Sequence, residues 1–375
     1  MKLTTKQQLR VDVISRYLRG DITSQDACIA LEIKERQFRR LVRSFRTEGV
    51  SSVIHGNKGR SPTNRTNSSL EQKIITKYKD RYDGLNLVHF REKLLEEEEI
   101  ISVPSYSTIR KILLREKLIS PTIKRRKGIH KIRRRYEREG IMIQIDGSHH
   151  HWLPRHSPCC LTAAIDDATG KVLGATFTPT ETTFAAMEAV GQIIKSKGIF
   201  QMLYSDRAGL YGNSKRIGYS NMERAMKELG VIPLQASTPQ GKGRVERLFK
   251  TLQDRLCSEM RLRRIRNLKE ANEFLKVFLP KFNQRFAVAP SCEEAAYKPL
   301  PIDKNLDEIF CMKDYRRVQN GHVISYGGEV LAIESDEFLL RKQVEIRHYQ
   351  SGETKFFVGE KEIKATRIKN QKKAA

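Results

Sequence analysis

The sequence predicts a multidomain protein with helical modules at the N-terminus, a central α/β core with a mixed sheet, and a small all-β domain at the C-terminus. Three observations predict this fold class. Apolar residues recur every three or four positions up to about residue 118, which is typical of amphipathic helices. Between residues 141 and 262, short β-branched runs alternate with helical patterns. From residue 313 onward, short apolar runs are separated by Gly-containing turns, which indicates strands.

The first predicted module is a helix-turn-helix with a basic outer face. We expect helices at residues 5–18, 25–31 and 34–46, with Ser24 as the cap of the second. A short helix, a tight turn and a basic helix are typical of modules that place the second helix in the major groove of DNA. The alternative is a solvated charged face on an ordinary bundle. The candidate DNA contacts are Lys34, Arg36, Gln37, Arg39, Arg40 and Arg43.

A second copy of this plan is predicted further along the chain. We expect helices at residues 69–82 and 88–97, and a third at 106–117 that Ser105 caps. The acidic run at 96–99 argues against contact between this whole surface and phosphate groups. The candidate DNA contacts of this module are Tyr106, Arg110 and Lys111.

The two connecting segments are basic. The connector at residues 55–65 includes Arg60 and is interpreted either as a minor-groove contact or as a solvated linker. Eight Lys and Arg residues lie between Lys124 and Arg135, in a run that either tethers two domains or follows the DNA backbone. Its candidate DNA contacts are Arg133, Arg134 and Arg135. Residues 1–140 hold 33 Lys and Arg against 17 Asp and Glu, so most of the net charge of +26 lies at the front and indicates a polyanionic partner.

The central segment predicts five strands, near residues 141–146, 161–165, 172–177, 200–204 and 231–234. The second and third strands are expected to form a hairpin, and Thr180 is expected to cap a crossover helix. If the first and fourth strands are parallel neighbours, Asp146 and Asp206 meet at the sheet edge where α/β proteins bind ligands. Glu246 lies at the edge of the apolar stripe of a helix at 245–257, so it can lean over the sheet.

Three carboxylates at one edge of a sheet favour a metal-dependent reaction on phosphate groups. Carboxylate oxygens suit Mg²⁺, which binds through a few carboxylates together with substrate phosphates. Two such ions ~4 Å apart can hold the attacking and the leaving oxygen of a phosphoryl displacement. Without cations, a cluster of three carboxylates would be costly.

Five sequence motifs carry a resemblance to a known family: QIDGSHHHW at 144–152, AIDDATG at 164–170, LYSD at 203–206, GRVER at 243–247 and FNQRFA at 282–287. On these motifs, residues 141–300 resemble the retroviral-integrase superfamily, and within it the ISNCY group of bacterial insertion-sequence transposases. The resemblance implies an RNase H-like fold, with Asp146, Asp206 and Glu246 as the catalytic residues and the ligands of two Mg²⁺ or Mn²⁺ ions. Thirty-nine residues separate Asp206 from Glu246, more than in retroviral integrases, and the excess is expected to form a surface loop.

Basic residues flank the predicted triad. The resemblance implies that Lys250, one helical turn after Glu246, touches DNA near the cut end. Lys242 and Arg244 are further candidate DNA contacts because they adjoin Glu246 in the sequence.

Other residues that often bind metals are assigned less specific roles. His149, His150 and His151 alternate faces on a strand, so contact with DNA or a structural turn is favoured over a shared metal ion. Asp166 and Asp167 lie in a turn, which favours a structural role over metal binding. The six cysteines form no CxxC pair and are expected to be reduced thiols, and the zinc module of retroviral integrases is not evident.

The expected layout combines these elements in order. It comprises helix-turn-helix domains at 1–50 and 68–118, basic linkers at 51–67 and 119–140, a catalytic core at 141–262, a helical extension at 263–312, a five-stranded SH3-like barrel at 313–368 and a disordered tail at 369–375. No apolar run reaches the length of a membrane span and residues 1–10 are polar, so we expect no membrane contact, no secretion signal and a cytoplasmic, nucleoid-associated location in a bacterium.

These expectations combine into a DNA transposase. It would bind the terminal inverted repeats of an insertion sequence, cleave the DNA, and join the freed 3′-OH to target DNA as a homodimer or larger synaptic assembly. One competing interpretation is a catalytically silent helix-turn-helix regulator derived from a transposase. The other is a nuclease of the same fold that cuts double-stranded DNA without joining it.

Overall fold

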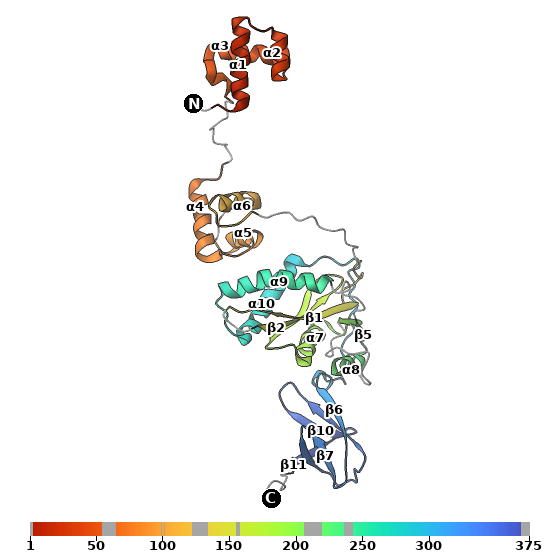
Figure 1. Ribbon diagram of the computed structural model, residues 1–375. Coiled ribbons are helices and arrows are strands. Elements are labelled where there is room, and N and C mark those ends of the chain that lie inside the picture. The colour runs from red at the N-terminus through yellow and green to blue at the C-terminus, as the bar shows by residue number, and fades with distance from the viewer. Residues whose placement is uncertain are drawn as a thin grey trace. The chain divides into compact units, whose positions relative to one another are not determined.

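A computed structural model describes residues 3–54, 65–98, 100, 102–121, 134–154, 158–205, 220–235 and 243–368. The chain divides into two compact units, residues 1–73 and 74–375 (Figure 1), and each is described separately. Across the parts of the chain so described, no helix is both long and apolar enough to cross a membrane. All six cysteines are free thiols, as predicted.

The first unit holds the predicted helix-turn-helix. Its helices are α1 (Thr5–Arg19), α2 (Ser24–Leu31) and α3 (Glu35–Glu48), followed by a 3-10 turn, η1 (Gly49–Val53). Buried Ile14, Ala27 and Phe38 hold the three helices together. The prediction that Ser24 caps α2 is wrong: the cap is Thr23, because its hydroxyl accepts the Asp26 N–H at 3.2 Å while the Asp26 carboxylate accepts the Thr23 N–H.

The second helical module contains α4 (Ser68–Lys77), which crosses the boundary between the units and continues into a π-helical turn, η2 (Tyr78–Tyr82). Helices α5 (Leu87–Glu96) and α6 (Tyr106–Arg115) follow. Ser105 caps α6 as predicted, since its hydroxyl accepts the Thr108 N–H at 3.3 Å. The module therefore begins its last helix where the sequence placed it.

The central sheet has five strands in the order β3-β2-β1-β4-β5. The strands are β1 (Met142–His150), β2 (Cys159–Asp166), β3 (Val172–Thr178), β4 (Met202–Ser205) and β5 (Ile232–Gln235). Strands β1, β2 and β3 are antiparallel, whereas β1 pairs with β4 in parallel, with Ile143 opposite Leu203. The predicted hairpin, the mixed sheet and the parallel neighbourhood of the first and fourth strands are confirmed.

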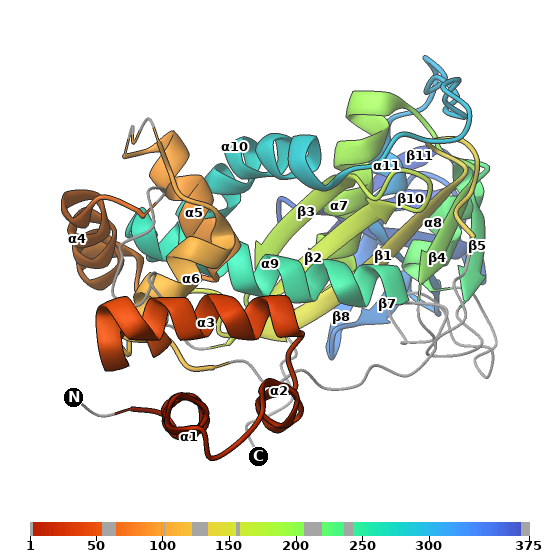
Figure 2. The ribbon, with the colours of Figure 1, turned by 90° about the horizontal axis from the view of Figure 1, so that it is seen from above.

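Helices bury both faces of this sheet (Figure 2). Helices α7 (Thr183–Lys197) and α8 (Asn221–Glu228) pack on the face that carries Ile143 and Ile145. Helices α9 (Gly243–Leu262) and α10 (Leu268–Phe286) pack on the face that carries Leu161 and Ala163. Two covered faces explain why every residue of β2 is buried.

Two details of α7 differ from, or add to, the sequence-based expectation. The prediction that Thr180 caps this helix is wrong, because Thr182 does so by accepting the Ala185 N–H at 3.1 Å. Thr180 and Thr182 both follow β3, and both have a hydroxyl that can cap a helix. Thr182 is the cap because the helix begins at Thr183. The helix also lies unusually close to β3: a Cβ on Gly174 would stand 2.0 Å from the Ala189 carbonyl oxygen, so only glycine fits.

The C-terminal domain is a six-stranded sheet in the order β6-β9-β10-β11-β8-β7. A short helix, α11 (Leu306–Ile309), precedes its strands, which are β6 (Met312–Arg317), β7 (Val323–Tyr326), β8 (Glu329–Glu334), β9 (Gln343–His348), β10 (Thr354–Val358) and β11 (Lys361–Arg367). The prediction of five strands is wrong. The sequence signal for β11 is weak because Ile363 is its one buried residue and charged side chains fill most of the strand.

Candidate active site

Asp146 lies on the face of the central sheet that α9 covers. It stands opposite Ala163 on β2, and Ala163 packs in the cluster that contains Val245 and Leu248 of α9. Directly paired residues on neighbouring strands share a face, so the Asp146 carboxylate is on the α9 side. The strand does not end at Asp146 but continues to His150, and Asp146 is half-buried.

Asp206 follows β4 directly in the sequence and lies outside the described residues, as do Arg60, Arg133 and Lys242. The parallel pairing of β1 and β4 reaches Gln144 opposite Tyr204. Asp146 and Asp206 each come two residues after this pair. The expectation that the two carboxylates meet at one edge of the sheet stays a prediction.

Glu246 is in the first turn of α9 and is exposed, whereas its neighbour Val245 is buried in the core. Leu248, Phe249 and Leu252 continue the buried stripe, so Glu246 lies beside this stripe as predicted. Its carboxylate is free of the core and near the start of a helix, where the N–H groups of the first turn favour negative charge.

Two contacts fix α9 along β1. At the first anchor, the buried Asp167 accepts a hydrogen bond from Gln144 Nε2 on β1 at 2.6 Å and forms an ion pair with Arg244 on α9. At the second anchor, Gln253 Nε2 on α9 donates to Ser148 Oγ on β1 at 3.3 Å.

The spacing of the anchors on the two elements matches. From Arg244 to Gln253 the helix rises about 13.5 Å at ~1.5 Å per residue. From Gln144 to Ser148 the strand advances about 13 Å at ~3.3 Å per residue. Helix and strand therefore run in the same direction, and Asp146 and Glu246 both lie between the two anchors.

The two adjacent aspartates after β2 have different surroundings. Asp166 accepts hydrogen bonds from Gly140 N at 2.9 Å and from Thr169 N at 2.7 Å, and burial raises the pKa of its carboxyl. These are the contacts of a structural turn, which supports the structural interpretation of Asp166. The Asp167 side chain instead bridges the two elements that carry Asp146 and Glu246.

The basic run that precedes the core is attached to this turn at its end. The Arg135 guanidinium donates to the main-chain oxygens of Asp167 at 3.1 Å and Ala168 at 3.3 Å, and Tyr136 N donates to the Asp167 carboxylate at 3.1 Å. Burial, followed by the neighbouring charge of Arg244, lowers the pKa of Arg135. Arg135 and Tyr136 are therefore held by the core.

The predicted DNA contacts differ in how accessible they are. Arg244 is paired with Asp167 and its side chain is only 16% exposed, whereas Lys250 and Arg134 are exposed. The basic residues of the outer face of α3 are also exposed, as are Tyr106 and Lys111 of α6, while Arg110 is half-buried. Contact with DNA stays a prediction for all of them.

The three consecutive histidines do not gather at one point. His150 contacts Trp152 edge-on, with ring centroids 5.5 Å apart, while His149 and His151 are exposed. Within the ranges that the model describes, no three His, Cys, Asp or Glu side chains form a cluster that would hold a metal ion. Asp206, the third member of the predicted carboxylate set, lies outside those ranges.

No protein-family model matches the chain. The transposase for insertion sequence IS1202 of Streptococcus pneumoniae is 32% identical over 355 residues, which cover 84% of this chain and 75% of that protein. The chain belongs to the insertion-sequence transposases. A second relative, the transposase y4bF of Sinorhizobium fredii (strain NBRC 101917 / NGR234), is 30% identical over 357 residues, which cover 92% of this chain and 77% of the relative. The family predicted from the sequence motifs is confirmed.

Two solved structures are also similar to this transposase. A chain in the cryoEM structure of a simian T-cell lymphotropic virus intasome in complex with PP2A regulatory subunit B56 gamma is 15% identical, with 72% of this chain and 92% of that chain covered, at a TM-score of 0.35. The HTLV-2 integrase catalytic core domain in complex with magnesium, in its trimeric form, is 18% identical, with 42% and 95% covered, at a TM-score of 0.33.

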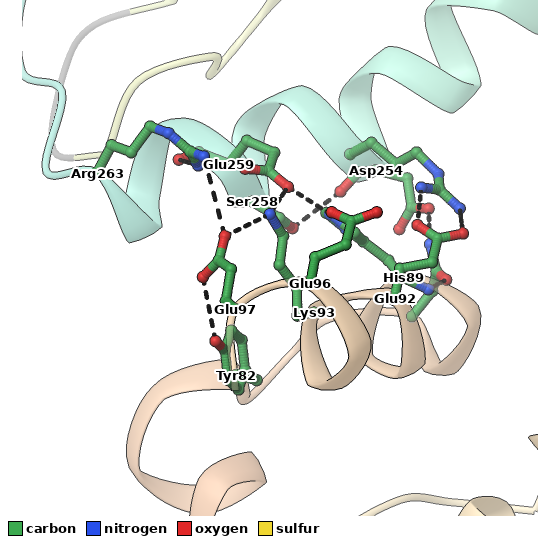
Figure 3. A network of polar contacts seen from close by, with 12 residues as sticks. Tyr82, His89, Glu92, Lys93, Glu96, Glu97, Asp254, Ser258, Glu259 and Arg263 are labelled. Carbon is green, nitrogen blue, oxygen red and sulfur yellow. Dashed lines mark hydrogen bonds and ion pairs between the residues drawn. The ribbon is translucent and has the colours of Figure 1, made fainter. Parts of the chain in front are cut away.

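A second polar network, which no pattern in the sequence predicts, joins α5 to the C-terminal half of α9 (Figure 3). Buried Glu259 on α9 accepts from His89 Nε2 at 2.7 Å and from Lys93 Nζ at 2.5 Å. Burial opposes ionisation of Glu259, but the hydrogen bonds from His89 and Lys93 outweigh it and lower its pKa to about 2. Glu92 of α5 binds Arg255 of α9 at 2.5 Å.

The acidic run that follows α5 also has intramolecular partners. Glu97 binds Lys93 at 2.8 Å, and Glu98 binds Lys77 at 2.5 Å. These pairs explain the acidic run without a role in DNA binding. Helix α9 thus carries Glu246 in its first turn and contacts α5 towards its end.

Proposed function

We propose that the transposase cleaves DNA at the ends of an insertion sequence and joins the freed 3′-OH to target DNA, with Asp146, Asp206 and Glu246 as its catalytic residues. The observation that carries this proposal is the shared setting of Asp146 and Glu246. Both lie on one side of the central sheet, between the two anchors that align α9 with β1. Family membership supplies the reaction class.

The donor set suits divalent metal ions. Asp146 is half-buried and Glu246 is exposed, and Asp206 supplies a third carboxylate in the sequence. Oxygen-only ligands favour Mg²⁺ or Mn²⁺, and two bound ions would lower the cost of activating the attacking oxygen and of expelling the leaving oxygen. The protein's own contribution is to hold the carboxylates in place. Transfer between DNA oxygens needs no covalent bond between protein and DNA.

The helical modules would supply the recognition of the DNA ends. The exposed basic face of α3 and the exposed residues of α6 fit binding to double-stranded DNA, and each is the last helix of its module. We propose the domain order expected from the sequence, in which these modules bind the terminal inverted repeats. Joining two ends in one reaction calls for a homodimer or a larger synaptic assembly.

The tests are cleavage of DNA that carries an uncut element end and strand transfer on pre-cut end DNA, each by the full-length protein with Mg²⁺ and separately with Mn²⁺. Asp146→Asn, Asp206→Asn and Glu246→Gln keep side-chain size but remove the charge that binds a cation. Each should abolish cleavage and joining while end binding survives, and the losses should not add, because the three residues act as a unit. Glu273→Gln, an exposed glutamate paired with Lys276 on α10, is the matched control and should retain activity.

Three results would contradict this proposal. Near-normal turnover by the Glu246→Gln protein would mean that a residue other than Glu246 is the third metal ligand. Cleavage without joined product in the unaltered protein would favour the nuclease. Specific end binding with no metal-dependent reaction at all would favour the silent regulator.

A further inference from the structure

We propose that Asp167 is a positioning residue, which holds α9 and β1 in the alignment that brings Glu246 and Asp146 together. This inference rests on the proposed function of those two carboxylates. Asp167 touches neither of them in any contact described above; it acts through Gln144 and Arg244. Each of these partners comes two residues before a proposed catalytic carboxylate.

Burial makes the Asp167 contacts strong and specific. Its side chain is fully buried, and a buried carboxylate is costly unless hydrogen bonds and a positive charge compensate it. Gln144 Nε2 at 2.6 Å, Tyr136 N at 3.1 Å and the Arg244 guanidinium meet this need. Loss of the charge would break the ion pair between Asp167 and Arg244.

The ion pair between Asp167 and Arg244 matters for the site because Arg244 lies in the same helical turn as Glu246. Arg244 is the second residue of α9, in a first turn whose N–H groups have no partners within the helix and which is prone to fraying. The ion pair ties this turn to the core. Since Glu246 is in the same turn, its carboxylate stays in place only if the turn does.

Gln144 ties β1 to Asp167 in the same way that Arg244 ties α9 to it. It is almost fully buried on β1, and its side chain shares the α9-facing side with Asp146, because residues two apart on a strand point the same way. One carboxylate therefore binds a residue of each catalytic element. Asp166, equally buried and next in sequence, binds neither: its partners are Gly140 and Thr169.

This contrast makes Asp166→Asn the matched control for Asp167→Asn. Both substitutions keep side-chain volume and remove one buried negative charge. The readouts are the rate of strand transfer on pre-cut ends, the Mg²⁺ concentration for half-maximal rate, the affinity for end DNA and the thermal midpoint. We expect Asp167→Asn to slow strand transfer by about 10- to 100-fold, because a displacement of about 1 Å can cost 10²-fold.

The metal dependence separates positioning from general destabilisation. Asp167→Asn should raise the half-maximal Mg²⁺ concentration several-fold while end binding stays within twofold. Asp166→Asn should lower the thermal midpoint by a similar or greater amount and leave the Mg²⁺ dependence unchanged. Equal Mg²⁺ dependence in unaltered protein and Asp167→Asn, or the same shift in both variants, would overturn the proposal.

A double-mutant cycle with Arg244→Gln tests the mechanism directly. If Arg244 acts through Asp167, the double variant should be no slower than the slower single variant, because the two residues share one interaction. Additive losses, or an Arg244→Gln variant that weakens end binding without changing the Mg²⁺ dependence, would make Arg244 a DNA contact and overturn the proposal. If Asp167→Asn does not fold, the Mg²⁺ dependence and the end binding of Arg244→Gln alone provide the test.

Failure of this inference is distinguishable from failure of the proposed function. Asp146→Asn serves as the reference in the same assay. If Asp146→Asn is inactive and Asp167→Asn is normal, only the positioning role is lost. If Asp146→Asn retains full activity, the catalytic assignment itself is wrong.

Discussion

Two basic residues close to Glu246 have different surroundings although both were predicted to contact DNA. Arg244 is paired with buried Asp167, whereas Lys250 is exposed one helical turn after Glu246. An exposed ammonium near a cleavage site is suited to neutralising a phosphate, as a compact and strongly hydrated charge. Lys250 is therefore the stronger candidate for contact with the DNA end.

We expect Lys250→Ala to weaken binding of pre-cut end DNA and to flatten its salt dependence. Loss of one phosphate contact should reduce the slope of log affinity against log salt by about 0.9. The measurement is a titration of full-length protein at several salt concentrations. Lys269→Ala, which removes an exposed lysine at the start of α10, is the control and should leave the slope unchanged. An unaltered slope for Lys250→Ala would refute the contact.

At the scale of elements, α9 is held at its start by Asp167 and towards its end by α5. Buried Glu259 contacts His89 and Lys93 of α5, and it also pairs with Arg263 of its own helix (Figure 3). A glutamate with partners on another module joins that module to the helix that carries Glu246. The contribution of this interface can be measured as a change in the free energy of unfolding.

We expect Glu259→Gln to lower the free energy of unfolding by about 3 kcal/mol near pH 7, since removing one partner of a buried pair leaves the others uncompensated. Glu259 has a pKa of about 2 in the folded chain against an ordinary 4.5, so its contribution is complete above pH 4.5 and declines as the pH falls towards 2. At pH 3 the difference from unaltered protein should be about half. Urea unfolding at both pH values checks this.

The exposed Glu273→Gln variant controls for loss of a carboxylate, and should change stability by less than about 0.5 kcal/mol at either pH. A Glu259→Gln difference that is small at pH 7, or that grows as the pH falls, would contradict the interpretation of this network.

At the scale of the whole molecule, the net charge of +26 is concentrated in residues 1–140, which include both helical modules. Charge alone supplies affinity for any DNA, whereas contacts with base edges supply the preference for a sequence. The exposed face of α3 is the candidate for the second role.

We expect Arg40→Ala in the full-length chain to reduce the preference for end DNA over random duplex by about 1–3 kcal/mol, the value of one good base contact. Competition binding at fixed salt measures this preference. Arg19→Ala removes an exposed arginine of α1 that pairs with Asp21, and should lower affinity for both DNAs equally. The same outcome for Arg40→Ala would make α3 a general phosphate-binding surface.

Local patterns in the sequence determined most elements of this protein and the identity of its candidate carboxylates. The alternation around Ile143, the cap at Ser105 and the stripe that begins at Val245 each depend on residues a few positions apart, so each could be recognised without the fold. The same holds for the motifs that indicated the family. The weakly apolar β11 and the choice between two neighbouring hydroxyls for a helix cap could not be resolved in this way.

Only the tertiary structure decided which charged residues are partners. Asp167 and Arg244 are 77 positions apart, and His89 and Glu259 are 170 positions apart. No periodicity links such residues, because their proximity depends on how α9 packs on the sheet and on where α5 meets α9. Burial then turns these pairs into strong interactions, since a charge without water must be compensated by its neighbours. The sequence shows that Asp166 and Asp167 lie in a turn, and only the fold shows that the second of them contacts Gln144 of β1 and Arg244 of α9.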